Sequence, residues 1–172
     1  AWTWAGDNHA LWIDPDDSRH MLLGYDFGFS ITYDGGKNWY HPDNLPLAYL
    51  YAVGGDRSYP YNVYGGTQDN GGWKGPSTKK GRIPIRLEDW EHVVGGDGFY
   101  HQIDPVTNRY LYNESQWGEI QRVDLKTGKR KWLPYRGGIG EDEIRLNWNT
   151  PILISPHNSD VIYHGSNFLM RS

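Results

Sequence analysis

Two aspartates are the residues of this sequence whose type and spacing best suit catalysis. The chain aligns on three glycines that follow expected strands, Gly28, Gly71 and Gly118. Asp26 and Asp69 stand two residues before the first two of these glycines. A pair of carboxylates about 5 to 9.5 Å apart suits glycoside hydrolysis, with one as general acid and the other as base or nucleophile. Asp26 and Asp69 are therefore the candidate catalytic pair if the chain is a hydrolase.

Short polar side chains gather in three further loops of the sequence. They are Asp7, Asn8, His9, Gln68, Asp69, Asn70 and Asp97. Such loops form either a polar binding rim or turns in which Asx side chains bond the local backbone, and the sequence favours the second interpretation.

Other catalytic and metal-binding patterns are missing from the sequence. The seven histidines show no HxH or HExxH spacing, and there is no EF-hand calcium loop. No serine stands in a nucleophile elbow, and the arginines do not recur at equivalent positions as a sialidase cluster would require. No metal or cofactor is predicted.

The composition predicts the kind of scaffold that would position these residues. The chain has 172 residues, with 9 Trp, 13 Tyr and 22 Gly but only 37% hydrophobic residues. Aromatic residues favour strands and glycine marks turns, so this mixture predicts many short strands. A net charge of −4 gives no basic footprint for nucleic acid, and two basic runs, 79–82 and 126–131, are interpreted as exposed loops. The absence of cysteine fits a periplasmic or secreted protein without disulfides, and no apolar run is long enough to cross a membrane.

A unit of short strands repeats along the chain with starts near residues 8, 48, 97 and 149. First strands are expected at 11–13, 50–55, 101–103 and 152–154, each before an Asp or Ser that opens a turn. Second strands are expected at 20–24, 62–66, 110–113 and 161–165, and third strands at 29–33, 120–123 and 168–171. This period of about 40 to 50 residues is typical of four-stranded propeller blades. We therefore expect an all-β propeller segment over 1–172, of three and a half to four antiparallel blades, with an insertion loop at 74–94.

A Thr-x-Asp-x-Gly-x-x-Trp motif, an Asp-box, closes the first unit. Its residues are Thr32, Asp34, Gly36 and Trp39. We expect Asp34 to accept hydrogen bonds from the turn that it opens, the glycines to allow positive φ, and the indole to pack in the core. A degenerate copy consists of Asp124, Gly128 and Trp132, and Trp132 is likewise expected in the core.

These motifs together resemble bacterial proteins with sortilin-type (VPS10-like) Asp-box, or BNR-repeat, propellers, which are often described as glycosyl-hydrolase-like. The matching stretches are 6–15, 33–39, 64–71, 95–100 and 147–151. The resemblance implies an exported β-propeller, although relatives by fold include hydrolases, sorting receptors and assembly factors.

The leading prediction is a non-catalytic propeller module that binds a protein. The unfinished set of blades suggests that a partner covers open blade edges or completes the propeller. The module would be an accessory or scaffold subunit of an extracytoplasmic or membrane-associated complex. The alternatives are a fragment of a glycoside hydrolase and a carbohydrate-binding module.

Overall fold

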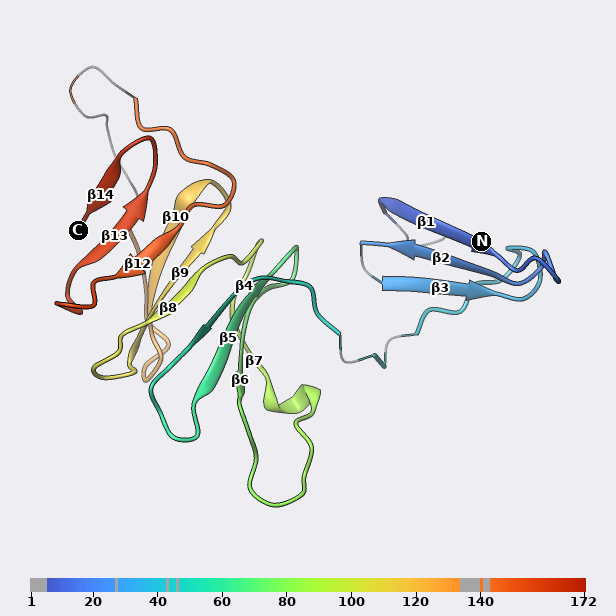
Figure 1. Cartoon of the computed structure of the whole chain (residues 1–172), viewed down its shortest axis with the longest axis horizontal. Coiled ribbons are helices and arrows are strands. Elements are labelled where there is room, and N and C mark those ends of the chain that lie inside the picture. Colours follow the sequence, from blue (N-terminus) through green and yellow to red (C-terminus); the bar gives the residue numbers. More distant parts are fainter. Residues whose placement is uncertain (1–5, 27, 43, 46, 134–139, 141–142) are drawn as a thin grey trace. The chain divides into compact units, whose positions relative to one another are not determined.

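The computed structural model describes residues 6–26, 28–42, 44–45, 47–133, 140 and 143–172. Within them the chain is all-β, as the sequence predicts, with four antiparallel sheets of three or four strands (Figure 1). Its contacts divide the chain into two compact units, residues 1–46 and 47–172, which are described separately. The described residues include no helix that is long and apolar enough to span a membrane.

The first unit contains one sheet, the first blade. Its strands β1 (Asn8–Ile13), β2 (Met21–Tyr25) and β3 (Gly28–Thr32) pair in the order β1-β2-β3. An isolated bridge between Ile31 and Tyr40 adds the start of a fourth strand beside β3.

The second blade has four strands in the order β4-β5-β6-β7. They are β4 (Leu50–Gly55), β5 (Asn62–Thr67), β6 (Gly71–Pro76) and β7 (Glu91–Val94). The predicted insertion loop at 74–94 is therefore wrong at both ends, because β6 extends to residue 76 and β7 begins at residue 91. The intervening loop holds a single 3-10 turn, η1 (Leu87–Asp89). β7 pairs with β6, and its two valines are buried. Both features depend on tertiary packing, so the four residues of β7 did not predict a strand on their own.

The third blade also has four strands, in the order β11-β10-β9-β8. They are β8 (His101–Ile103), β9 (Tyr110–Ser115), β10 (Glu119–Asp124) and β11 (Arg130–Trp132). The 3-10 turn η2 (Gln116–Gly118) joins β9 to β10. The fourth blade has three described strands, which are β12 (Ile152–Ile154), β13 (Ile162–Gly165) and β14 (Leu169–Arg171).

The same turn recurs after the first strand of every blade. Its opening residue is Asp14, Asp56, Asp104 or Ser155. In each case a side-chain oxygen accepts the backbone N–H two residues later, at 2.9 to 3.2 Å. The opening residue's own N–H donates to the carbonyl just before or at the start of the second strand, at 2.8 to 3.2 Å. An Asx or Ser turn fixes the local backbone through its own side chain. Because this turn recurs in every blade, its residues mark the repeat period in the sequence.

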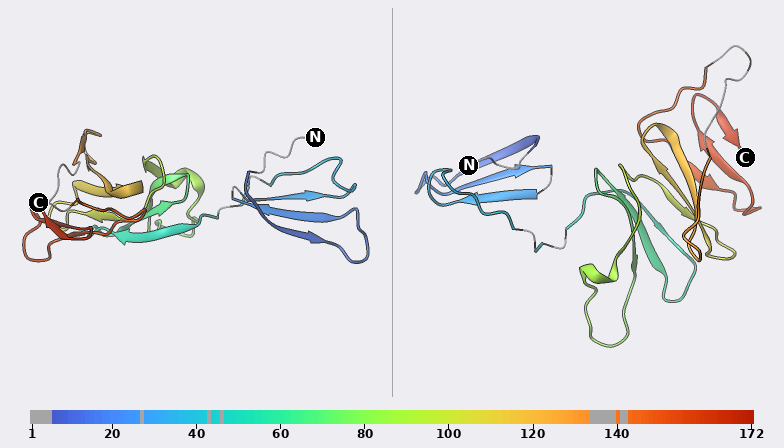
Figure 2. Two further views of the ribbon diagram at one scale, coloured as in Figure 1. Left: turned by 90° about the horizontal axis from the view of Figure 1, so that it is seen from above. Right: turned by 180° about the vertical axis from the view of Figure 1, so that it is seen from behind.

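The three blades of the second unit pack side by side through their first strands. β8 lies between β4 and β12, as neighbouring blades of a propeller do (Figures 1 and 2). Close approach depends on glycine, because a Cβ at Gly54 would lie 2.4 Å from the carbonyl oxygen of His101. An apolar cluster fills the space between the second and third blades, and Tyr64 and Leu111 are its most deeply buried members.

Candidate functional site

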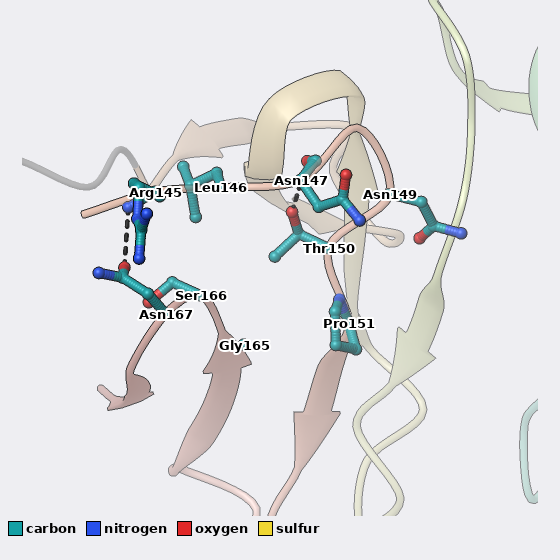
Figure 3. Close-up of a pocket in the computed structure, with 9 residues that line it drawn as sticks. All are labelled: Arg145, Leu146, Asn147, Asn149, Thr150, Pro151, Gly165, Ser166 and Asn167. Carbon is teal, nitrogen blue, oxygen red and sulfur yellow. Dashed lines mark hydrogen bonds between the residues drawn. The ribbon is translucent and has the colours of Figure 1, made fainter.

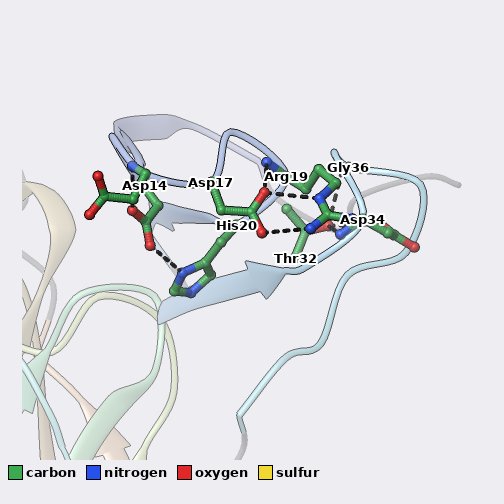
Figure 4. Close-up of polar contacts among 8 residues, drawn as sticks. Asp14, Asp17, Arg19, His20, Thr32, Asp34 and Gly36 are labelled. Carbon is green, nitrogen blue, oxygen red and sulfur yellow. Dashed lines mark hydrogen bonds and ion pairs between the residues drawn. The ribbon is translucent and has the colours of Figure 1, made fainter.

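The side chains of Thr32 and Asp34 in the predicted Asp-box bond their own turn, as expected (Figure 4). Trp39 is half-buried and is not part of the core, so the expectation that its indole packs in the core is wrong. Thr32 Oγ1 donates to Asp34 Oδ1 at 2.9 Å and accepts the N–H of Gly36 at 3.0 Å. Asp34 Oδ1 also accepts the N–H of Asn38 at 2.9 Å. The Trp39 ring lies over Gly36, with its Nε1 donating to the Gly36 carbonyl at 3.1 Å. Hydrogen bonds from Asn38 are the main reason why the pKa of Asp34 falls to about 2.

Replacing Asp34 with Ala is expected to open this turn. The amide of Asn38 loses its acceptor, so its hydrogen exchange should accelerate by about 10-fold or more, and the first unit should unfold several degrees earlier. Hydrogen exchange measured by NMR tests this. The matched control is Asp16→Ala, which removes an exposed carboxylate that forms no hydrogen bond to the described residues. Unchanged protection of Asn38 in the Asp34 variant would contradict the assigned role.

The degenerate Asp-box of the third blade differs from the prediction. Asp124 does accept the N–H of Lys126 at 3.0 Å, but it is also paired with Arg109 Nη2 at 2.7 Å. Trp132 is 55% exposed rather than part of the core, and no atom lies within 4 Å of a Cβ built on Gly128. The reason is spacing. Trp39 follows Gly36 by three residues and folds back over it, whereas Trp132 follows Gly128 by four and stands at the end of the edge strand β11.

The repeat alignment that paired Asp26 with Asp69 does not hold in the structure. The hairpin at Asp26 connects directly paired residues Tyr25 and Gly28 through two residues. The hairpin at Asp69 connects Thr67 to Gly71 through three. The two aspartates also belong to different units. In the first unit, Asp26 Oδ1 and His9 Nε2 form an exposed hydrogen bond of 2.5 Å.

The strand pairing shows that Asp69 corresponds instead to Trp117. Ser115 pairs with Glu119 across three residues, just as Thr67 pairs with Gly71. The middle residue has positive φ in both hairpins, 57° for Asp69 and 60° for Trp117. Aligning on Gly71 and Gly118 therefore shifted the register by one residue.

The predicted polar rim divides between the two units. Asp7, Asn8 and His9 lie in the first unit, whereas Gln68, Asp69, Asn70 and Asp97 lie in the second. Here the structure brings Asp69 and Asp97 together, because Asp97 Oδ1 accepts the N–H of Asp69 at 2.8 Å. Asn70 Nδ2 donates to the carbonyl of Gln68 at 3.1 Å. The side chains of Asp97 and Asn70 bond the backbone, as the turn-capping interpretation predicts for these two residues.

An aromatic strip that the sequence analysis did not single out crosses one end of the second unit. It consists of Tyr49, Tyr51, Phe99, Trp148 and Trp117. Consecutive rings are in contact, with centroids 5.7, 4.8, 6.5 and 5.2 Å apart in that order. Tyr49, Trp117 and Trp148 are 73%, 58% and 41% exposed, whereas Phe99 is buried and anchors the strip.

The backbone holds the Trp117 ring at the tip of the β9–β10 hairpin. A bulky residue at φ 60° is an outlier that costs on the order of 1 kcal/mol or more. The N–H of Trp117 donates to the carbonyl of Trp148 at 3.1 Å, and the two rings meet at 90°. Asp69 fills the same position in the second blade, where an Asx residue tolerates this conformation well. Strain of this kind is found at functional sites, which makes Trp117 the residue that most needs an explanation.

Glu114 joins the loops beneath the exposed end of the strip. Its side chain is fully buried, and its Oε1 accepts the N–H of Thr150 at 3.0 Å. Burial raises the pKa of Glu114 to about 8, against a smaller lowering by the backbone N–H groups of Thr150, Gly118 and Tyr100. Since Thr150 follows Trp148 by two residues and Glu114 precedes Trp117 by three, this carboxyl group links the two hydrogen-bonded loops that carry the tryptophans.

Two buried histidines accompany Glu114. Burial lowers the pKa of His101 and of His164 to about 4, so both are neutral at neutral pH. His101 Nδ1 contacts the carbonyl of Phe99 at 3.0 Å and so supports the buried member of the strip.

An open groove of about 520 Å³ lies beside the segment that leads to Trp148 (Figure 3). Asn167 holds this segment, because its Oδ1 accepts the N–H of Arg145 at 2.8 Å and its Nδ2 donates to the carbonyl of Glu143 at 3.0 Å. Thr150 Oγ1 donates to the carbonyl of Asn147 at 2.8 Å and closes the turn around Trp148. Asn167 and Thr150 thus hold the segment that carries Trp148.

Comparison with known proteins adds no relative, since no protein-family model and no curated protein matches the chain.

Proposed function

We propose that this protein is a non-catalytic β-propeller module that binds another protein through the aromatic strip. The observation that carries the proposal is the exposure of Trp117 and Trp148 in contact with each other, on loops that Glu114 and the Trp117–Trp148 backbone bond hold in place. Tryptophan and tyrosine dominate binding hot spots because each buries a large area at low cost in side-chain entropy.

The electrostatics of the strip agree with a protein ligand. Its five side chains carry no charge, and the buried Phe99 at its middle fixes the rings on either side. Protein interfaces are depleted of charged residues at their core and enriched in aromatic residues. A preorganised strip loses little entropy on binding, which favours affinity.

The outer edge of β14 has no paired strand among the described residues. Ile162 and Ser172 exchange backbone hydrogen bonds at 3.2 and 3.0 Å. By alternation, the backbone groups of Leu169 and Arg171 then point away from β13. Among the described strands, none pairs with that side of β14.

The proposed setting is an extracytoplasmic or membrane-associated complex in which the chain is an accessory or scaffold subunit. The support for this setting is the resemblance of the Asp-box repeats to exported sortilin-type propellers and the absence of cysteine from the chain.

Native pull-down from the source organism, with the protein as bait, tests the proposal. We expect Trp117→Ser and Trp148→Ser each to reduce recovery of a specific partner by about 10-fold or more, because each deletes a central aromatic contact. The control is Tyr61→Ser, which removes an aromatic side chain that is 52% exposed at the opposite end of the second blade. Partner recovery that is equal for all four proteins, or no specific partner at all, would refute the proposal.

A further inference from the structure

The two tryptophans of the aromatic strip differ from other tryptophans of this protein in the state of their indole N–H groups. Nε1 of Trp39 and Nε1 of Trp73 each donate to the backbone carbonyl three residues earlier, at 3.1 and 2.8 Å. In the part of the chain that the structure describes, Nε1 of Trp117 and Nε1 of Trp148 have no acceptor. An indole nitrogen is a donor only, so these two groups call for a ligand that supplies acceptors.

The exposed rings of the strip meet nearly at right angles and form corners rather than a flat platform. Trp117 and Trp148 cross at 90°, and Tyr49 and Tyr51 cross at 82°. A sugar ring stacks on one flat aromatic face, whereas a corner between two rings contacts a compact apolar ring from two sides. The pyrrolidine ring of proline is compact and apolar, and proline-rich segments dock on aromatic-lined surfaces of this kind.

The separation of the two corners suits a polyproline II (PPII) helix. Only the ring of Phe99 stands between them, with its centroid 4.8 Å from that of Tyr51 and 6.5 Å from that of Trp148. Phe99 is buried, so a ligand passes over it. One intervening ring makes the gap comparable to one turn of a PPII helix, about 9 Å. Because this helix has three residues per turn, prolines three residues apart lie on the same side and reach both corners.

We infer that the partner segment bound by the aromatic strip is a proline-rich PPII helix. The carbonyl groups of such a helix make no bonds within it, and proline has no N–H, so the segment presents acceptors to the two indole donors. A run of prolines carries no side-chain charge, which matches the five uncharged side chains of the strip. The inference rests on the proposed function and narrows the partner to one class of segment.

NMR titration of the full chain with deca-L-proline tests the inference, because each indole N–H gives its own signal. We expect the signals of Trp117 and Trp148 to shift at millimolar peptide, while those of Trp39 and Trp73 stay in place. The comparison ligands, at the same concentration, are a decapeptide of alternating glycine and serine and the neutral sugar cellohexaose. Unmoved Trp117 and Trp148 signals with deca-L-proline, or equal shifts with either comparison ligand, would overturn the inference.

Variants that keep an aromatic ring isolate the contribution of the indole donors. Trp117→Phe and Trp148→Phe each remove one free N–H and should each weaken deca-L-proline binding by about 3-fold to 10-fold, the effect of one hydrogen bond. The matched control is Trp73→Phe, which removes an N–H already bonded within its own hairpin and should leave the affinity unchanged. Equal affinities of the wild type and the two strip variants would overturn the inference.

The titration and the native pull-down together separate this inference from the proposed function. A partner that is lost with Trp117→Ser, together with indole signals that deca-L-proline does not move, would overturn the inference and leave the proposed function standing. Indole signals that do move, with no specific partner in the pull-down, would refute the proposed function and support the recognition of PPII segments by the strip.

Discussion

Replacing Glu114 with Gln should make the protein more stable at neutral pH and change the pH dependence of its stability. The folded chain keeps this carboxyl group protonated up to about pH 8, whereas its ordinary pKa is 4.5. Because the folded pKa is raised, the folded state binds the extra proton between these two values, and stability falls as the pH rises through that window. At pH 7 the wild-type protein should have lost about 3 kcal/mol relative to its fully protonated form.

The measurement is the free energy of unfolding of both proteins in urea at a series of pH values. The difference between Glu114→Gln and wild type should grow by about 1.4 kcal/mol per pH unit from pH 5 to pH 8 and then level off. Taking the difference removes the contribution of His101 and His164, whose lowered pKa values make both proteins lose stability as the pH falls from 6.5 towards 4. A difference that does not depend on pH would contradict the buried, neutral state of Glu114.

Replacing Gly66 with Ala should disrupt the packing of the second blade against the third. A Cβ on Gly66 would lie 2.1 Å from the carbonyl oxygen of Gly98 and 2.5 Å from the backbone nitrogen of Phe99. Both neighbours are backbone atoms, so a side-chain rotation cannot relieve the clash. We expect a loss of about 3 kcal/mol or more in the free energy of unfolding.

The control for this prediction is Gly55→Ala on the adjacent strand β4. There the nearest atom to an added Cβ is the carbonyl oxygen of Asn62 at 3.6 Å, which is an ordinary contact. That variant should change stability by about 1 kcal/mol at most. Urea denaturation of the two variants gives the comparison, and similar midpoints for Gly66→Ala and wild type would show that the blades are not packed as described.

The repeat could be predicted from the sequence because its signals are local. The turn at Asp14, Asp56 or Asp104 depends on a side chain that bonds the backbone two residues later. The Asp-box at Asp34 is likewise complete within eight residues of sequence. Interactions of this range follow from residue type and spacing alone.

The aromatic strip could not be predicted, because its members are far apart in the sequence and meet only when the blades pack. Tyr51 belongs to the second blade, whereas Phe99 and Trp117 belong to the third. Trp148 lies just before the first strand of the fourth blade and contacts Trp117. The alignment on Gly71 and Gly118 also missed that Trp117 replaces Asp69, since the register of a hairpin depends on which residues pair. The one signal of the strip in the sequence was Trp117, which directly precedes Gly118 after an expected strand.

Chemical footprinting of the protein in its native complex would test the central claim most directly. Hydroxyl-radical labelling, read by mass spectrometry, reports the solvent exposure of each aromatic side chain with and without the partner. The account predicts that Trp117, Trp148 and Tyr49 are protected in the complex, while Tyr61 is labelled equally in both states. Full labelling of Trp117 and Trp148 in the intact complex would contradict the claim that the aromatic strip is the docking surface.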